Sequence, residues 1–347
     1  MKVLMCSDKN VYVNRPGGPD MQFFTEANMK KLYSLFDEVV WNETGRQFTK
    51  EELIENVKDC DAVITCWGSN MFDEEIIKHA PKLKIIAHLA GSVSYIVNKD
   101  TYDRGIAVIG ANDLQFAESV AECALLYALT MLRKMHEAIP AFRNNGGKAW
   151  GTTKAKCLGI FDRNVGIVSF GAIGEYLAGL LQPFHCNIKV YSRSISEEKL
   201  KKYNMTQASL EEIFETCDVI SLHTAWNKHT ENMITKELMM SMKPGSVLVN
   251  TARGKIIDEP ALYEVFKARP DISAALEVFW QEPLPEGHPL YELENVMVMD
   301  HRGGPTHDRY HYIASDIMDY VYDYLTTGKL PEKGVIPCEK AVNMTIS

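Results

Sequence analysis

The chain has 347 residues, which suggests two domains at roughly 100–200 residues per domain. Hydrophobic residues make up 46% and charged residues 24% of it, a composition typical of a folded globular protein, which excludes disordered and collagen-like chains. The net charge of -9 disfavours a role on nucleic acid or on a membrane surface, because both need a basic footprint.

Targeting and metal signals are weak. No apolar run approaches the roughly 18 residues of a membrane span, and the apolar part of MKVLMCSDKN is too short for a signal peptide. The eight cysteines form no C-x-x-C pair, and several lie in apolar runs. We therefore expect reduced thiols, a cytoplasmic location and no metal site. His307 and His311 have a spacing that suits zinc on the expected terminal helix, but no further ligand accompanies them.

The first third of the chain alternates short apolar runs with amphipathic segments. Thr49 followed three residues later by Glu52 is a capping-box signature for one predicted helix. Strand–helix alternation favours a parallel sheet with helices on both faces. The strands are predicted at 2–6, 38–41, 62–66, 83–89 and 106–109, and the helical segments at 49–58 and 72–79.

A long apolar pattern at 117–135 predicts a helix that is buried on nearly all sides, and 144–151 indicates a break. A second alternating run follows, and a helix from about 306 to 327 precedes a short tail. Strands with helices between them match the doubly wound nucleotide-binding arrangement. The six predicted strands of this run lie at 165–169, 187–191, 218–222, 246–250, 272–276 and 296–299.

The first strand of this run leads into S-F-G-A-I-G at 169–174 and then into a helical pattern. Gly171 would let the backbone approach a pyrophosphate, Gly174 would let the helix pack on the strand, and the helix N-terminus would hold the anion. Ser169 replaces the first glycine of the dinucleotide-binding pattern. A serine fits this position where the backbone dihedral angles are ordinary. An incidental turn is the alternative, but the position at the head of a strand series favours dinucleotide binding.

The second strand of the run is followed by Ser192 and Arg193, where NAD-binding domains place an acid for the ribose 2′-hydroxyl. An acid would repel a 2′-phosphate, whereas a serine hydroxyl and a guanidinium bind it. We therefore expect NADP as the preferred cofactor and NAD as the alternative. A solvated surface arginine is the plain explanation of Arg193.

Three polar residues follow the last three predicted strands: Arg253, Glu282 and His301. Because the carboxyl ends of parallel strands share one edge, we expect these side chains to converge near the nicotinamide. A histidine can donate the proton that carbonyl reduction needs, and a carboxylate bonded to it raises its pKa. A guanidinium can bind the carboxylate of a 2-oxo acid. Each residue alone is more often structural, but the three together favour catalysis.

The chain resembles the D-isomer-specific 2-hydroxyacid dehydrogenases over most of its length. The resemblance rests on VGIVSFGAIG, DVISLHT, KPGSVLVNTARG, EVFWQEPLPEGHPL, ENVMVMDHRGGPT and ESVAE. It implies an α/β fold of two doubly wound parallel-sheet domains. A Rossmann nucleotide-binding domain at 116–309 would be inserted in a flavodoxin-like substrate domain made of 1–115 and 310–347. The two long helices would be the crossings between the domains, and the protein would be a homodimer.

The resemblance also implies roles for residues. His301 would be the general acid/base, Glu282 its partner and Arg253 the substrate anchor. Backbone amides at Ala90, Gly91, Ser92 and Val93 would bind the substrate carboxylate. Cofactor contacts are expected from Gly171, Ala172, Ile173, Gly174, Ser192, Arg193, His223, Thr224, Thr230, Thr251, Ala252, Glu277 and Gly303.

The sequence also departs from the family pattern. Glu277 stands where the family has Asp, and Asp300, which either raises the pKa of His301 or points to solvent, replaces the usual residue before that histidine. Residues 90–95 read A-G-S-V-S-Y, so the substrate stays open between a glyoxylate-like or hydroxypyruvate-like acid and a bulkier 2-oxo acid. Two alternatives remain: a related dehydrogenase of a sugar-derived acid, and a non-catalytic NAD(P)-sensing protein on the same scaffold.

Overall fold

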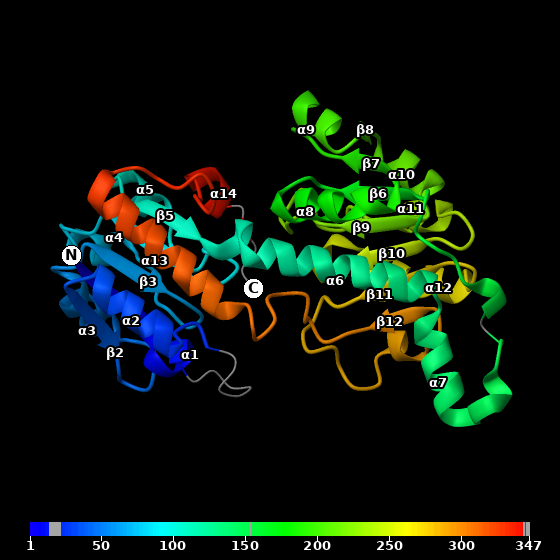
Figure 1. Cartoon of the computed structure of the whole chain (residues 1–347), viewed down its shortest axis with the longest axis horizontal. Helices are drawn as coiled ribbons and strands as arrows, with labels where there is room; N and C mark the ends of the chain where they lie inside the picture. Colours follow the sequence, from blue (N-terminus) through cyan, green and yellow to red (C-terminus); the bar gives the residue numbers. More distant parts are fainter. Residues whose placement is uncertain (14–21, 153, 343, 345–347) are drawn as a thin grey trace. The chain divides into compact units, whose positions relative to one another are not determined.

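The structure is a computed structural model that describes residues 1–13, 22–152, 154–342 and 344. The chain divides into two compact units, one made of Met1–Ala117 with Pro305–Ser347 and the other of Glu118–Gly304 (Figure 1). Each unit is built around one parallel sheet. Within the described residues, no helix is both long and apolar enough to cross a membrane. The assignment of the units to substrate and nucleotide stays a prediction.

The first unit contains all five strands that the sequence predicts there. They are β1 (Lys2–Asp8), β2 (Glu38–Asn42), β3 (Ala62–Thr65), β4 (Ile85–His88) and β5 (Ala107–Gly110). All pairs are parallel, and the strand order β2-β1-β3-β4-β5 is that of flavodoxin-like sheets. β3 and β4 are buried along their whole length, which explains why they appear in the sequence as continuous apolar runs.

Helices of the first unit bury two apolar clusters against this sheet. The described elements are α1 (Lys9–Val13), α2 (Glu26–Leu35), α3 (Lys50–Val57), α4 (Glu74–Lys78), α5 (Lys99–Asp103), η1 (Ala111–Asp113), α13 (Tyr310–Thr327) and α14 (Cys338–Val342). α13 contributes a buried stripe that includes Ile313, Ile317 and Val321. It begins at Tyr310 rather than at about 306, so His307 lies outside the helix and the expected i, i+4 pair with His311 does not form on it.

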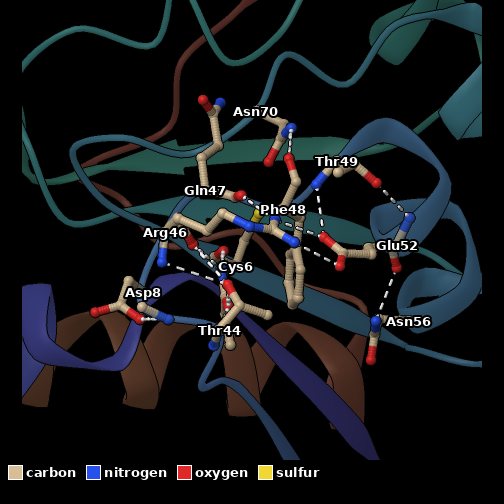
Figure 2. Close-up of polar contacts among 12 residues, drawn as sticks. Cys6, Asp8, Thr44, Arg46, Gln47, Phe48, Thr49, Glu52, Asn56 and Asn70 are labelled. Carbon is tan, nitrogen blue, oxygen red and sulfur yellow. Dashed lines mark hydrogen bonds and ion pairs between the residues drawn. The ribbon is translucent and has the colours of Figure 1, made fainter.

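The predicted capping box is confirmed at the start of α3. The Thr49 hydroxyl accepts a hydrogen bond from the Glu52 N–H (3.2 Å), and the Glu52 carboxylate accepts one from the Thr49 N–H (2.8 Å). Figure 2 shows this pair beside the loop after β2, where Arg46 donates two 2.8 Å hydrogen bonds to the same carboxylate. The box satisfies N-terminal amides that the helix itself leaves unpaired, and so it defines the first turn.

The second unit has seven parallel strands, one more than the sequence predicts. They are β6 (Asn164–Val168), β7 (Asn187–Tyr191), β8 (Met205–Gln207), β9 (Val219–Leu222), β10 (Val247–Asn250), β11 (Ser273–Leu276) and β12 (Val296–Val298). Their order is β12-β11-β10-β9-β6-β7-β8, which is a doubly wound Rossmann order. The chain adds β7 and β8 on one side of β6 and the strands from β9 to β12 on the other side, so the topological switch point lies between β6 and β9. The prediction missed β8 because only Met205 of its three residues is buried.

Helices and 3-10 turns connect the strands of the second unit. They are α6 (Gln115–Leu132), α7 (Met135–Asn145), η2 (Gly146–Ala149), η3 (Lys154–Lys156), α8 (Ala172–Leu181), η4 (Gln182–Phe184), α9 (Glu197–Lys202), α10 (Leu210–Thr216), α11 (Lys236–Ser241), η5 (Gly254–Ile256), α12 (Glu259–Ala268) and η6 (Pro289–Glu292). α6 begins three residues before the boundary between the units. The second crossing is the segment before α13 and not a helix, in contrast to the prediction.

The prediction that the first long helix is buried on nearly all sides was wrong. One face of α6, which includes Ala121, Ala128 and Met131, is buried against the seven-stranded sheet, but Leu126 on another face is 57% exposed. The helix also ends earlier than expected, because Lys134 adopts a left-handed backbone (φ 54°) and a separate helix, α7, starts after it. A helix that is apolar on all sides reveals no orientation from its pattern alone.

Candidate active site

The turn between β6 and α8 has the geometry of a phosphate-binding turn. Gly171 is the N-cap of α8, no side chain caps that helix, and a Cβ added at Gly171 would meet nothing within 4 Å. A Cβ at Gly174 would lie 2.9 Å from the Ser169 carbonyl oxygen and 3.2 Å from Ile167. The missing side chains therefore leave the helix N-terminus open to an anion and let the helix close onto the strand.

Ser169 departs from the expectation that its dihedral angles would be ordinary. Its φ is 77°, in the left-handed region that favours glycine. A non-glycine residue in this region costs about 1–2 kcal/mol. The chain holds it there with a hydrogen bond from the Ser169 N–H to the Tyr191 carbonyl oxygen (2.8 Å), which ties the turn to β7.

The loop after β7 carries the residues expected to select the cofactor. Ser192 is half-buried, and its carbonyl oxygen accepts a 3.0 Å hydrogen bond from the Gln207 amide. Arg193 is exposed, and within the described residues its guanidinium forms no hydrogen bond or ion pair. The loop backbone is thus held by β8, the strand that the sequence did not reveal, while the guanidinium stays available.

Three buried polar atoms lie without a protein partner after β9 and β10. They are Nδ1 of His223, Oγ1 of Thr251 and Nε of Arg253, each unpaired within the described part of the chain. A buried polar atom left unsatisfied costs about 1–3 kcal/mol. Nε2 of His223 is hydrogen-bonded to the Ser221 hydroxyl (2.9 Å). Burial lowers the pKa of His223 to about 4, so the ring is neutral. These atoms fit the polar groups of a dinucleotide and an acid substrate.

Other expected cofactor residues have their side chains already engaged or absent. The Thr230 hydroxyl donates to the Ala225 carbonyl oxygen (2.7 Å) and accepts from the Asn227 N–H (2.9 Å), and its own N–H donates to the Asn227 carbonyl oxygen (2.9 Å). Thr224, just after β9, and Ala252, just after β10, are half-buried. Ala172 and Ile173 form the first turn of α8 and present backbone amides.

The structure brings His301 and Glu282 together. Nδ1 of His301 lies 2.6 Å from Oε2 of Glu282, and Oε1 of Glu282 accepts a 3.0 Å hydrogen bond from the Phe279 N–H. Because Nδ1 faces a carboxylate, it carries the hydrogen, and Nε2 gains a proton only in the charged ring. Both side chains are part-exposed, at 44% for His301 and 35% for Glu282. The arrangement presents Nε2 as a proton donor.

The electrostatics match that role. The hydrogen bond to Glu282 raises the pKa of His301 above its ordinary value of 6.5, against a smaller opposing effect of burial. Burial raises the pKa of Glu282, but the hydrogen bonds from His301 and Phe279 together with the charge of Arg253 bring it below 4.5. Burial lowers the pKa of Arg253, against the charges of Glu282 and Glu277.

Asp300 takes the second of its two expected orientations. It is exposed, and its carboxylate accepts hydrogen bonds from Nε (2.5 Å) and Nη2 (2.9 Å) of Arg302. These contacts lower the pKa of Asp300, the Arg302 hydrogen bond having the largest effect. Asp300 therefore points to solvent, and the acid that faces His301 is Glu282.

Close backbone packing joins the Arg253 segment to the Glu282 segment. A Cβ at Gly254 would lie 2.0 Å from the carbonyl carbon of Phe279, so only glycine fits there. Phe279 in turn donates its N–H to Glu282. The guanidinium of Arg253 donates from Nη1 to the Ala252 carbonyl oxygen (2.6 Å). The positions of the guanidinium and the carboxylate are thus set by one contact between two loops.

Glu277 and Gly303 face each other at the end of β11. Glu277 is 1% exposed, and its Oε2 accepts a 3.0 Å hydrogen bond from the Tyr127 hydroxyl. A Cβ at Gly303 would lie 2.3 Å from Oε1 of Glu277. Sequence reasoning missed Tyr127, because a helical tyrosine in an apolar run looks like any core aromatic residue.

The expected substrate-contacting residues Ala90–Val93 lie in the first unit, just after β4. Ala90 and Val93 are buried in its two apolar clusters, Gly91 is half-buried, and the Ser92 hydroxyl lies 2.9 Å from that of Ser94. This segment therefore offers its backbone rather than its side chains. Among the residues that the structure describes, no group of His, Cys, Asp and Glu is placed to hold a metal ion.

Comparison with known proteins places these features in a family. The family model for the D-isomer specific 2-hydroxyacid dehydrogenase, NAD binding domain, matches residues 125–303. The chain is 32% identical to a glyoxylate reductase of Korarchaeum cryptofilum over 284 residues, 82% of this chain and 85% of that protein. It is 30% identical to a D-3-phosphoglycerate dehydrogenase of Methanocaldococcus jannaschii over 91% of this chain and 60% of that one. The fold is shared with a D-mandelate dehydrogenase of Rhodotorula graminis, with a TM-score of 0.80 at 21% identity over 97% of both chains.

Proposed function

This chain belongs to the D-isomer specific 2-hydroxyacid dehydrogenase family, and we propose that it transfers a hydride between a nicotinamide dinucleotide and a small 2-oxo or 2-hydroxy acid. The observation that carries the proposal is the 2.6 Å contact between His301 and Glu282 at the carboxyl edge of the seven-stranded sheet. The phosphate-binding turn before α8 lies at the same edge, since β6 and β12 run parallel in one sheet.

The residues divide the work of carbonyl reduction. A nicotinamide dinucleotide, held at the turn before α8, would supply a hydride for the carbonyl carbon. Nε2 of protonated His301 donates its proton to the carbonyl oxygen as the C=O π bond is lost. Glu282 stabilises the charged ring and fixes its orientation, and Arg253 binds the substrate carboxylate with its buried guanidinium. In the reverse direction neutral His301 accepts the hydroxyl proton.

For the cofactor we propose NADP over NAD, because Arg193 is exposed and its guanidinium is uncommitted beside Ser192. The adenosine 2′-phosphate would lie at this loop and the pyrophosphate at the N-terminus of α8. Further contacts are proposed from the backbone and side chains of Gly171, Ala172, Ile173, Gly174, His223, Thr224, Thr230, Thr251, Ala252 and Gly303.

For the substrate we propose a short 2-oxo acid of the glyoxylate or hydroxypyruvate type. Support comes from the relatives named glyoxylate reductase, which are matched over most of their length. We propose the guanidinium of Arg253 in the second unit as a contact of the substrate carboxylate, and the backbone at 90–93 in the first unit as a further substrate contact. The free thiols of all eight cysteines support the proposal of a cytoplasmic location.

We also propose that the protein is a homodimer. None of the residues of α7 is buried, and its apolar side chains Met135, Ile139 and Phe142 are exposed. Trp150, which follows it, is 82% exposed and packs edge-on against Phe142. Exposed apolar side chains on one helix favour a protein partner, and a second copy of this chain is the partner proposed.

Two measurements test the proposed function. Tryptophan fluorescence titrations with NADPH and NADH report cofactor binding and preference. A panel of 2-oxo acids is then followed by the absorbance of the reduced nicotinamide. Turnover of a 2-oxo acid supports the enzyme, whereas cofactor binding without turnover of any acid points to a non-catalytic NAD(P)-sensing protein. Failure to bind either cofactor would contradict the proposal.

A further inference from the structure

Glu277 links three segments of the second unit. Its Oε2 accepts a hydrogen bond from the Tyr127 hydroxyl on α6 (3.0 Å), and its carboxylate packs against the backbone of Gly303 after β12. The approach to Gly303 is so close that a Cβ there would lie 2.3 Å from Oε1. Glu277 is 1% exposed, so its carboxylate presents almost no surface to a ligand.

Gly303 lies two residues after His301, and His301 has an unfavourable backbone. Its φ is 47°, in the left-handed region, which costs a non-glycine residue about 1–3 kcal/mol and persists only where surrounding contacts enforce it. The imidazole is held on one side by Glu282. The backbone after it packs against Glu277, which is almost fully buried.

We propose that Glu277, anchored by Tyr127, is a positioning residue that holds the backbone carrying His301, rather than a direct contact of the cofactor. The inference rests on the proposed function, since it assigns a second carboxylate to the same proton donor. It deepens that function, because it gives a structural role to the glutamate at the end of β11. From there its side chain reaches both α6 and the segment after β12.

The electrostatic surroundings are consistent with this role. Burial raises the pKa of Glu277. The Tyr127 hydroxyl, the charge of His301 and the nearby backbone amides of Arg302 and Gly303 oppose that rise. Cys123 on α6, Arg302 after β12 and Arg253 after β10 are the other titratable or charged groups near this cluster. The negative charge of Glu277 adds to the effect of Glu282 on the pKa of His301.

The central variant is Tyr127→Phe, which removes one hydroxyl and leaves the aromatic ring and Glu277 in place. The matched control is Tyr203→Phe, because the Tyr203 hydroxyl also donates to a glutamate (Glu175, 3.1 Å) in the same unit. With the 2-oxo acid that the wild type turns over best, we expect kcat to fall about 10-fold in Tyr127→Phe. The dissociation constant for NADPH should stay within about 2-fold, and Tyr203→Phe should match the wild type.

A second variant, Glu277→Gln, removes the charge and puts an amide NH2 among hydrogen-bond donors. Its His301 pKa should fall, because a negative neighbour has been lost. Histidine ring NMR tracks that pKa without any turnover, with the His301 signal assigned by its loss in His301→Ala. This arm separates the two claims: a shifted His301 pKa in a protein that reduces no 2-oxo acid leaves the positioning role standing and removes the proposed function.

Two results would overturn the inference. The first is a Tyr127→Phe protein whose kcat equals that of the wild type, with an unchanged His301 pKa in Glu277→Gln. The second is a loss of NADPH affinity in both variants with kcat unchanged at saturating cofactor, which would make Glu277 a cofactor contact. If Tyr127→Phe does not fold, the NMR titration of Glu277→Gln still decides between these outcomes.

Discussion

Nδ1 of His301 lies 2.6 Å from Oε2 of Glu282, and the second oxygen of that carboxylate is held by the Phe279 amide. The carboxylate is therefore fixed before any ligand binds, and the ring it orients can offer only Nε2 to a substrate. This relationship, more than the mere presence of a histidine, is what makes proton transfer at a carbonyl the favoured chemistry of the site.

The pH dependence of reduction should show the raised pKa of His301. The proton donor is the charged ring, so activity is present at low pH and is lost as pH rises through the folded-state pKa, which lies above 6.5. The rate of oxidation of the 2-hydroxy acid should instead rise with pH through the same pKa, because the neutral ring accepts the hydroxyl proton. In Glu282→Gln the largest cause of the shift is gone, and the limb in kcat/KM should move to lower pH by roughly one unit.

Asp300→Asn is the control for that profile. Asp300 is the nearest acid in sequence to His301, but it pairs with Arg302 in solvent. Its profile should coincide with that of the wild type. An alkaline limb that moves in Asp300→Asn but not in Glu282→Gln would show that the wrong carboxylate has been assigned.

Arg253→Lys should damage the use of the 2-oxo acid while sparing the cofactor. A lysine cannot form the two-pronged contact that a guanidinium makes with a carboxylate. We expect kcat/KM for the acid to fall roughly 100-fold, with NADPH affinity within about 2-fold of the wild type. Steady-state kinetics together with fluorescence titration measure both, and a loss confined to cofactor affinity would contradict the anchor role.

Two glycine substitutions should separate packing from cofactor binding. Gly254→Ala forces a Cβ to 2.0 Å from the Phe279 backbone and should cost about 3 kcal/mol of stability or more. Gly171→Ala meets nothing within 4 Å, and its free energy of unfolding should stay within about 1 kcal/mol of the wild type. Its NADPH affinity should nevertheless drop about 10-fold, because the new methyl group occupies the space proposed for the pyrophosphate.

Urea unfolding and fluorescence titration provide the two readouts. Gly179→Ala, on the same helix as the phosphate-binding turn but with its nearest neighbour at 3.9 Å, is the control for cofactor affinity. Equal NADPH affinity in Gly171→Ala and Gly179→Ala would contradict the proposal that this turn binds the pyrophosphate of the cofactor.

Arg193→Ala should lower the affinity for NADPH about 10-fold and leave that for NADH within about 2-fold, because only NADPH carries the 2′-phosphate. Lys201→Ala removes a nearby exposed cation and reports on non-specific charge effects. Fluorescence titration with both cofactors measures the ratio. Unchanged NADPH affinity in Arg193→Ala would mean that the guanidinium stays in solvent when the cofactor binds.

The strands of both sheets could be predicted from the sequence because buried parallel strands appear as unbroken apolar runs. β8 could not, since one buried methionine beside two exposed residues leaves no pattern. The end of α6 at Leu132 was equally hidden, because the left-handed backbone of Lys134 leaves no mark on the sequence pattern.

The residue types of the candidate site could be predicted from the side chains at the carboxyl end of each strand, but several of their backbone conformations and contacts could not. The left-handed backbones of Ser169 and His301 depend on the surrounding structure rather than on local propensity. The contact between Tyr127 and Glu277 joins residues 150 positions apart and requires the fold to be known. Whether Asp300 faces His301 or points to solvent likewise needed geometry.

The most direct test of this mechanism is the single-turnover rate of hydride transfer in His301→Ala, measured by reduced-nicotinamide absorbance at saturating cofactor and 2-oxo acid. Removal of the proton donor should slow the step roughly 100- to 10,000-fold, while the NADPH dissociation constant stays within about 2-fold of the wild type. A rate within about 3-fold of the wild type would show that His301 does not donate the proton, and the central assignment would be wrong.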